Sequence, residues 1–164
     1  MVQRRFGRQS IRFLNHPSIF SSAAVVGKKE GCGPLASYFD YISQDTKFGE
    51  KSWEKAESKM QEIALDTARE KANLKNSDID ILFAGDLLNQ CIGSSFSLRG
   101  TDIPFLGLYG ACSTMAESLL MAGLAVDGGY AATAAALTSS HFASAERQYR
   151  FPLVYGGQRT PTAQ

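Results

Sequence analysis

Long apolar runs are missing from this sequence. The longest candidates, residues 119–126 and 130–137, are bounded by charged residues such as Glu117 and Asp127. Both are far shorter than the ~18 continuous apolar residues that a membrane-spanning helix requires. The stretch 13–26 is interrupted by polar residues and a proline, so no secretory signal is predicted. The sequence therefore predicts a protein that is soluble or at most peripheral to a membrane.

Cysteine and histidine are scarce. The three cysteines, Cys32, Cys91 and Cys112, are odd in number and lack the spacing of metal ligands. This pattern predicts reduced thiols in a cytosol-like compartment, without disulfides, zinc or another metal, and no cofactor is predicted. The charge is nearly balanced, with 17 basic residues against 16 acidic ones. Nothing in the bulk electrostatics therefore indicates a nucleic acid as a partner.

Only the N-terminus is skewed in charge. Four arginines precede any acidic residue: Arg4, Arg5, Arg8 and Arg12. Such a segment is either a solvated tail, which we favour, or a contact to phosphate or anionic lipid. The predicted organisation is a basic tail over residues 1–17, one domain over residues 18–150 and an irregular tail over residues 151–164.

Alternating strand and helix patterns predict an α/β fold with a mostly parallel sheet. Apolar runs of strand length cover residues 18–27, 79–85, 104–109 and 130–137. Helix patterns cover residues 53–72, which Ser52 would cap, and residues 87–99 and 115–126. Residues 40–51 are polar and predict a loop. The glycine-rich stretch 27–34 lacks the spacing of a phosphate-binding loop and predicts an ordinary turn.

Two of the predicted helices differ in character. Apolar residues in 53–72 recur at spacings of three and four, with charged residues such as Glu57 elsewhere, so this helix is predicted to expose its charges on a solvated face. The helix at 115–126 is apolar almost all round. It is therefore predicted to be buried between layers.

The stretch 104–115 organises the rest of the chain. A strand-length apolar run ends, small residues turn the chain, and a helix opens where Thr114 and Glu117 have the spacing of a capping box. This strand–turn–helix elbow places Cys112 and Ser113 at a helix N-terminus. Unpaired N–H groups and the helix dipole favour an anion there.

Polar residues also follow two other predicted strands. Asp86, Asn89 and Gln90 come after the strand 79–85, and His141 follows the strand at 130–137. Ligands of open α/β sheets gather at the carboxyl ends of parallel strands, which makes these residues candidates for a site. The alternatives stay open: Asp86 could simply cap the helix after it, and His141 could be a proton carrier or ligand donor, or could cap the helix near residues 142–148.

Five segments carry a resemblance to a known family. They are residues 85–90 (Gly-Asp-Leu-Leu-Asn-Gln), 107–115 (Gly-Leu-Tyr-Gly-Ala-Cys-Ser-Thr-Met), 139–142 (Ser-Ser-His-Phe), 145–148 (Ala-Glu-Arg-Gln) and 155–159 (Tyr-Gly-Gly-Gln-Arg). In this order they resemble the stage V sporulation protein AD family, thiolase-fold proteins of endospore formers. The resemblance covers nearly the whole chain. It implies two similar halves in five layers, αβαβα, of which this chain resembles the first half without its last strand.

The resemblance also implies a longer protein, because family members run to about twice this domain-sized length. In the thiolase arrangement a fifth strand, starting just after Gln164, covers the strand at 130–137, and the second half covers the helix at 115–126. We therefore expect the 164-residue chain alone to aggregate or to be partly ordered. The reason is an exposed strand edge together with an exposed apolar helix face.

Two classes of function compete at Cys112. In an acyl transferase its thiolate would attack a thioester while backbone N–H groups hold the oxyanion. The resemblance implies that such enzymes also need His and Asn, or a second His, from their second half, and neither His16 nor His141 matches those roles. The second class is a binding protein. For this class the resemblance implies a site for pyridine-2,6-dicarboxylic acid, free or as its calcium chelate. It also implies that the protein acts with membrane proteins of the same operon to move this ligand into the forespore.

We rank a non-catalytic binding protein first, an acyl transferase second and a scaffolding subunit of a membrane transport assembly third. Asp86 would repel a bare dianion and would have to be protonated or meet the ligand's calcium. The resemblance implies a cytoplasmic protein of the forespore or of the periphery of the spore inner membrane, with full-length relatives as homodimers. The predicted ligand-binding residues are Asp86, Asn89, Gln90, Cys112, Ser113 and His141.

Overall fold

A computed structural model describes residues 4–88 and 91–144 of the chain. The strands are β1 (Arg5–Phe6), β2 (Ser10–Ile11), β3 (Val25–Gly27), β4 (Tyr41–Ser43), β5 (Ile81–Gly85), β6 (Phe105–Gly107) and β7 (Ala134–Thr138). The α-helices are α1 (Trp53–Lys71), α2 (Ile92–Ser97) and α3 (Thr114–Asp127). The irregular tail predicted at 151–164 lies outside the described residues.

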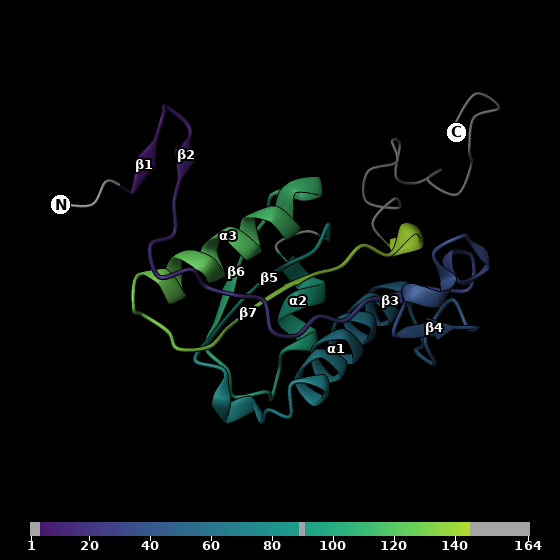
Figure 1. The fold of residues 1–164 in the computed structure, drawn as a ribbon. Helices are drawn as coiled ribbons and strands as arrows, with labels where there is room; N and C mark the ends of the chain where they lie inside the picture. The colour runs from purple at the N-terminus through teal and green to yellow at the C-terminus, as the bar shows by residue number, and fades with distance from the viewer. Residues whose placement is uncertain (1–3, 89–90, 145–164) are drawn as a thin grey trace.

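The main sheet has β5 at its centre, paired in parallel with β6 on one side and β7 on the other. Figure 1 shows α3 over one face of this sheet and α1 and α2 over the other. Within the described residues β6 and β7 form the two edges of the sheet. The predicted α/β class with a parallel sheet is confirmed.

The core lies between the sheet and the α1–α2 layer. Successive side chains of a strand point to opposite faces, so Leu82 and Ala84 face α1 while Gly85 faces α3, where a Cβ would meet Thr114. Leu82 and Ala84 are fully buried. The buried cluster around them is Leu65, Ile79, Leu82, Ala84, Leu98, Ile103 and Leu137.

The first predicted strand and the first predicted loop are both corrected. Only the last three residues of 18–27 form a strand, β3, and it pairs in parallel with β4 inside the predicted loop 40–51, apart from the main sheet. Two of the residues before β3, Ser21 and Ser22, are hydrogen-bonded to α1 instead. Ser21 Oγ donates to Ala68 O at 2.6 Å, and Lys71 Nζ donates to Ser22 O at 2.7 Å. These contacts take the place of a strand ladder.

Helix α1 begins where the sequence predicts. Ser52 is its N-cap in extended conformation and accepts a hydrogen bond from the Lys55 amide at 3.3 Å. The prediction that Glu57 belongs to a solvated face is wrong. Glu57 and Gln61 are fully buried on the side of α1 that also buries Ala56 and Leu65.

Helix α2 is shorter than the predicted helix 87–99. Cys91 has a left-handed backbone (φ 56°) and is the N-cap of α2, so the helix cannot extend backward through it. Asp86 accepts hydrogen bonds from the amides of Leu88 and Ser94, which holds Leu88 close to the start of α2. The chain therefore turns between β5 and α2.

Helix α3 departs from its prediction in two ways. Its N-cap is Ser113, and the predicted capping box of Thr114 and Glu117 does not form, because the Thr114 hydroxyl instead contacts Gly110 N and Ala111 O. The helix is also not buried all round. It packs on the sheet through small residues, and the large apolar side chains point away from the sheet. The partly exposed ones, at 37–43% exposure, are Met115, Leu119, Leu120, Met121 and Leu124.

The arginine-rich N-terminus forms a short antiparallel hairpin of β1 and β2, which projects beside α3 in Figure 1. Asp127, at the end of α3, fixes it through an ion pair with Arg4 and a hydrogen bond from Asn15 N at 2.7 Å. Phe13 packs on α3 where a Cβ at Gly123 would lie only 2.8 Å from its Cζ. Glycine at this position permits the close approach.

Candidate functional site at the carboxyl edge of the sheet

The carboxyl edge is the end of the sheet where β5, β6 and β7 stop, at Gly85, Gly107 and Thr138. Polar residues follow each of these strands, and those after β5 and β7 meet polar residues of α1 and α2. Because the three strands are parallel, their following loops gather at one edge. This edge contains most of the described candidate residues.

Asp86 is buried, and both of its oxygens are engaged. Oδ1 accepts from Leu88 N at 2.9 Å, and Oδ2 accepts from Ser94 N at 2.7 Å and from Ser94 Oγ at 2.6 Å. Ser94 is the third residue of α2, and Cys91 makes no side-chain cap. Asp86 therefore caps α2 from outside the helix, which is the structural alternative that the sequence left open.

Gln61 links Asp86 to a second buried carboxylate. Its Nε2 donates to Ser94 Oγ at 3.0 Å and to Ser139 Oγ at 2.8 Å. Ser94 in turn donates to Asp86, and Ser139 donates to Glu57 Oε1 at 2.9 Å. One buried amide thus donates to two serine hydroxyls, each of which donates to a carboxylate.

Glu57 terminates this network. Its Oε2 accepts from Ser144 Oγ at 2.5 Å, and the whole side chain is removed from solvent. Burial raises the pKa of Glu57, which outweighs the opposite effect of hydrogen bonds from Ser144 and Ser139, and the nearby Asp86 carboxylate raises it further. Glu57 is therefore harder to ionise in the folded chain than in water.

The elbow follows β6. Gly110 precedes a 3₁₀ turn, Ala111–Ser113, and α3 begins directly after it. Ala111 has a left-handed backbone (φ 50°), which is unusual for a residue with a side chain and gives the turn its sharpness. Cys112 and Ser113 are exposed. Ser113 Oγ lies 2.7 Å from Glu117 Oε1, so a carboxylate lies beside the exposed turn.

The elbow and the segment after β5 are neighbours. A Cβ on Gly85 would overlap Leu108 O, and Cys91 Sγ lies 3.1 Å from the same carbonyl. Burial is the main reason that the pKa of Cys91 is raised, and the Asp86 carboxylate adds to it. The structure therefore brings the described ends of segment 85–91 against the residues that lead into Cys112. Asn89 and Gln90 lie outside the described residues.

His141 sits at the rim of the edge with both ring nitrogens in use. Nδ1 accepts from Ala143 N at 3.2 Å, so Nε2 carries the proton that it shares with Thr46 O at 2.7 Å. Its ring lies 5.4 Å from that of Trp53, at the start of α1. In this arrangement His141 ties loop 45–49 to the end of β7 and caps the turn that follows.

Comparison with known proteins now bears on this geometry. The family description "Stage V sporulation protein AD" matches residues 7–164. Stage V sporulation protein AD of Bacillus subtilis (strain 168) is 48% identical over 158 residues, which cover 96% of this chain and 46% of that protein. The chain belongs to the stage V sporulation protein AD family. It spans about half the length of that relative.

Family membership makes this chain a sporulation protein and leaves the chemistry of the edge to its residues. In the described part of the chain, no group of three or more His, Cys, Asp or Glu side chains could hold a metal ion. No α-helix of that part is long and apolar enough to cross a membrane.

The sequence did not predict the buried hydrogen-bond network at the carboxyl edge. Glu57 and Gln61 were assigned to no function, although with Leu65 they recur every four residues and so share one stripe of α1. Ser94 and Ser97 repeat at a spacing of three and meet the same stripe, with Ser97 Oγ donating to Gln61 Oε1 at 2.8 Å. A buried polar stripe is visible in the sequence only once its partner serines are known.

Proposed function

We propose that this chain forms one wall of a binding site for pyridine-2,6-dicarboxylic acid, taken as its calcium chelate, and that the whole protein helps to move this ligand into the forespore. The observation that carries the proposal is the adjacency of segment 85–91 and the elbow at the carboxyl edge of the sheet. Two loops from neighbouring parallel strands are where such folds bind small ligands. This ligand is the one that the resemblance to the family implies, and the chain belongs to that family.

The elbow would supply the ligand's hydrogen-bond donors. Backbone N–H groups at the start of a helix are not used within the helix and favour a carboxylate. Ser113 and Cys112 are exposed at this point, so a ligand can reach the turn. Asp86 has another role in this proposal: its hydrogen bonds to Ser94 and Leu88 hold the neighbouring loop in place.

The calcium form of the ligand follows from the local charge. The Glu117 carboxylate contacts Ser113 and would repel a free dianion at the turn. The calcium ion of the chelate could instead bind this carboxylate, because calcium prefers oxygen ligands such as carboxylates. Glu117 therefore favours the chelate over the free dianion.

Calorimetry tests both parts of this proposal. We expect the chelate to bind more tightly than the metal-free dianion, and Glu117→Gln to remove that preference, whereas Glu70→Gln on α1 serves as the matched control. Asn89→Ala should weaken binding about ten- to a hundred-fold, because a hydrogen bond to a charged group contributes about 1.5–3 kcal/mol. Unchanged affinity for Asn89→Ala, Asp86→Ala and Glu117→Gln would place the site elsewhere.

Cys112 shapes the site without acting as a nucleophile in this proposal. A cysteine nucleophile is activated by a neighbouring base, and both nitrogens of His141 are hydrogen-bonded elsewhere. Incubation with an acyl thioester, followed by mass measurement, decides the matter. We expect no acyl adduct, and an adduct that disappears in Cys112→Ser would favour the acyl transferase instead. Membrane proteins of the same operon and a homodimer of the full-length protein remain predictions.

A further inference from the structure

The N-terminal hairpin is not part of the carboxyl edge, and it contains arginines without any acidic residue. We call residues 4–12 the arginine hairpin. It contains β1, β2 and four of the chain's arginines, and it projects from the body beside α3 (Figure 1). Arg5, Arg8 and Arg12 are exposed.

The charge of the arginine hairpin is largely uncompensated. Arg4 is paired with Asp127, but within residues 4–88 and 91–144 no carboxylate forms an ion pair with Arg5, Arg8 or Arg12. The first acidic residue of the sequence is Glu30. Arg5 Nη2 donates to Arg8 O at 2.9 Å, and in the described part of the chain its guanidinium forms no ion pair with a carboxylate. Three cationic groups are thus concentrated on a nine-residue turn of chain.

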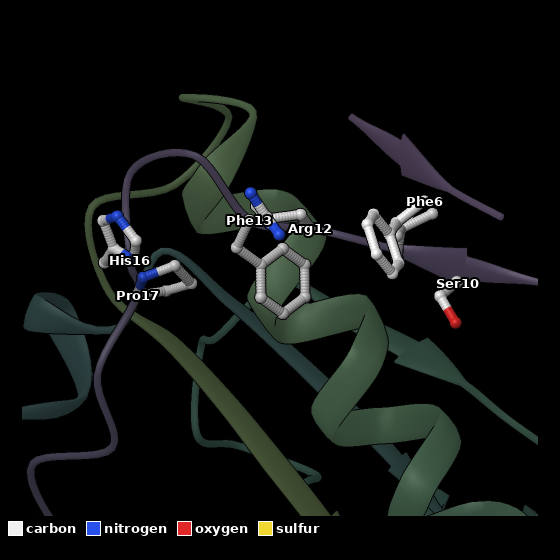
Figure 2. Close-up of a pocket in the computed structure, with 7 residues that line it drawn as sticks. Phe6, Ser10, Arg12, Phe13, His16 and Pro17 are labelled. Atoms are coloured by element: carbon white, nitrogen blue, oxygen red, sulfur yellow. The ribbon is translucent and has the colours of Figure 1, made fainter. Parts of the chain in front are cut away.

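Large apolar side chains are interleaved with these charges. Phe6 is 67% exposed and Ile11 45% exposed. Between them and the following segment lies an open hollow of about 470 Å³, also lined by Phe13, Pro17 and Arg12. Figure 2 shows Phe13 over α3 with Arg12 and Phe6 close to it, and the guanidinium carbon of Arg12 lies 5.5 Å from the centre of the Phe6 ring. An apolar floor with a cationic rim is the surface chemistry of peripheral membrane contacts.

The arginine hairpin is also fixed to the domain. A two-stranded hairpin alone is marginally stable in water. Here Asp127 accepts from Asn15 N at 2.7 Å, and its backbone carbonyl accepts from Asn15 Nδ2 at 2.8 Å, while Phe13 packs on Gly123. A partner bound by the hairpin would therefore be held in a defined orientation to α3.

We propose that the arginine hairpin binds the surface of a bilayer that contains anionic phospholipids. Arg5, Arg8 and Arg12 contact headgroup phosphates, and Phe6 and Ile11 enter the boundary between headgroups and acyl chains. The exposed apolar side chains favour a bilayer over a nucleic acid, because phosphate contacts alone need no apolar insertion. The proposal is independent of the ligand at the carboxyl edge.

Vesicle co-sedimentation of the full chain tests this proposal. We expect binding to phosphatidylcholine vesicles that contain phosphatidylglycerol and little binding to phosphatidylcholine alone. Each cationic residue near an anionic surface contributes roughly five-fold, so the triple variant R5Q/R8Q/R12Q should lose about a hundred-fold. The variant K55Q/K75Q/R99Q removes the same charge from other exposed positions and should bind like the parent chain. Phe6→Ser should weaken binding while leaving its preference for anionic vesicles.

Three results would overturn the proposal. Equal loss in the two triple variants would show that only net charge matters. Equal binding to neutral and anionic vesicles would point to the apolar face of α3 rather than to the arginines. Tighter binding to duplex DNA than to anionic vesicles, with no effect of Phe6→Ser on either, would identify a nucleic acid as the partner. Pelleting without vesicles corrects for self-association in every arm.

Discussion

Helices α1 and α3 cover opposite faces of the same sheet (Figure 1), and both bury polar side chains although their compositions are opposite. The largely charged α1 buries a glutamate and a glutamine, Glu57 and Gln61. The apolar α3 buries Thr114 and Ser118 and partly exposes leucines and methionines. Hydrophobicity alone therefore assigns the buried face wrongly in both helices.

The two helices differ in whether their unusually placed side chains find partners within the chain. Glu57 and Gln61 are paired through Ser139 and Ser94, as buried polar groups must be. The exposed face of α3 has no such compensation among residues 4–88 and 91–144, since Leu120 is 43% exposed and Leu124 38%. Helix α1 therefore builds the inside of the carboxyl edge, whereas α3 leaves an apolar face exposed among the described residues.

The largest effect is expected at Asp86. Asp86→Ala leaves the amides of Leu88 and Ser94 and the Ser94 hydroxyl without their acceptor, which should lower the free energy of unfolding by about 3 kcal/mol. Urea denaturation measures this loss. Asp66→Ala is the control, because Asp66 forms only a surface ion pair with Arg69 and should cost at most about 1 kcal/mol. Equal losses would mean that the buried network does not stabilise the edge.

Glu57 should make the stability depend on pH. Its pKa is higher in the folded chain than in the unfolded chain, so the folded chain binds the proton more tightly between these two values. Stability contributed by the neutral acid is present below the unfolded pKa and falls as pH rises through the folded pKa, by up to ~1.4 kcal/mol per pH unit. Glu57→Gln should remove this slope. Denaturation curves of both chains across mildly acidic to neutral pH check it, and parallel pH profiles would contradict the assignment.

The smallest effect on stability, with a large effect on association, is expected at α3. The chain alone should self-associate or be partly ordered, and L119Q/L120Q/L124Q should reduce association while changing the free energy of unfolding by about 0.5 kcal/mol or less per substitution. I19Q/F20Q, which removes exposed apolar groups elsewhere, should leave association unchanged. Sedimentation measures the mass of each variant. A monomeric parent chain with a cooperative melting transition would contradict this prediction.

The sequence predicted those elements whose signals are local. The apolar run of β5, the Ser52 cap of α1 and the strand–turn–helix order around Cys112 are confirmed within a few residues. Pairing between distant segments was not predictable. Ser21 and Ser22 are hydrogen-bonded to α1, and β4 forms because its partner β3 lies beside it. Both features depend on contacts between distant segments, so no single stretch of sequence predicts them.

The candidate site also has a part that local sequence signals predict and a part that they do not. The positions of Asp86 and Cys112 after their strands followed from strand patterns, but the partners of Asp86 did not. Glu57 reads as one more charge on an amphipathic helix until Ser139 and Ser144, more than eighty residues away, provide its hydrogen bonds. Long-range side-chain pairing decided which charge was buried.

We propose that pyridine-2,6-dicarboxylate binds at the carboxyl edge of the sheet. Amide hydrogen exchange of the chain, with and without the calcium chelate at millimolar concentration, tests it most directly, because exchange reports local opening residue by residue. We predict added protection at residues 110–114 and on both sides of the loop after β5, at Leu88 and Ser94, with none in the arginine hairpin. Protection confined to residues 4–17, or no protection anywhere, would contradict the account.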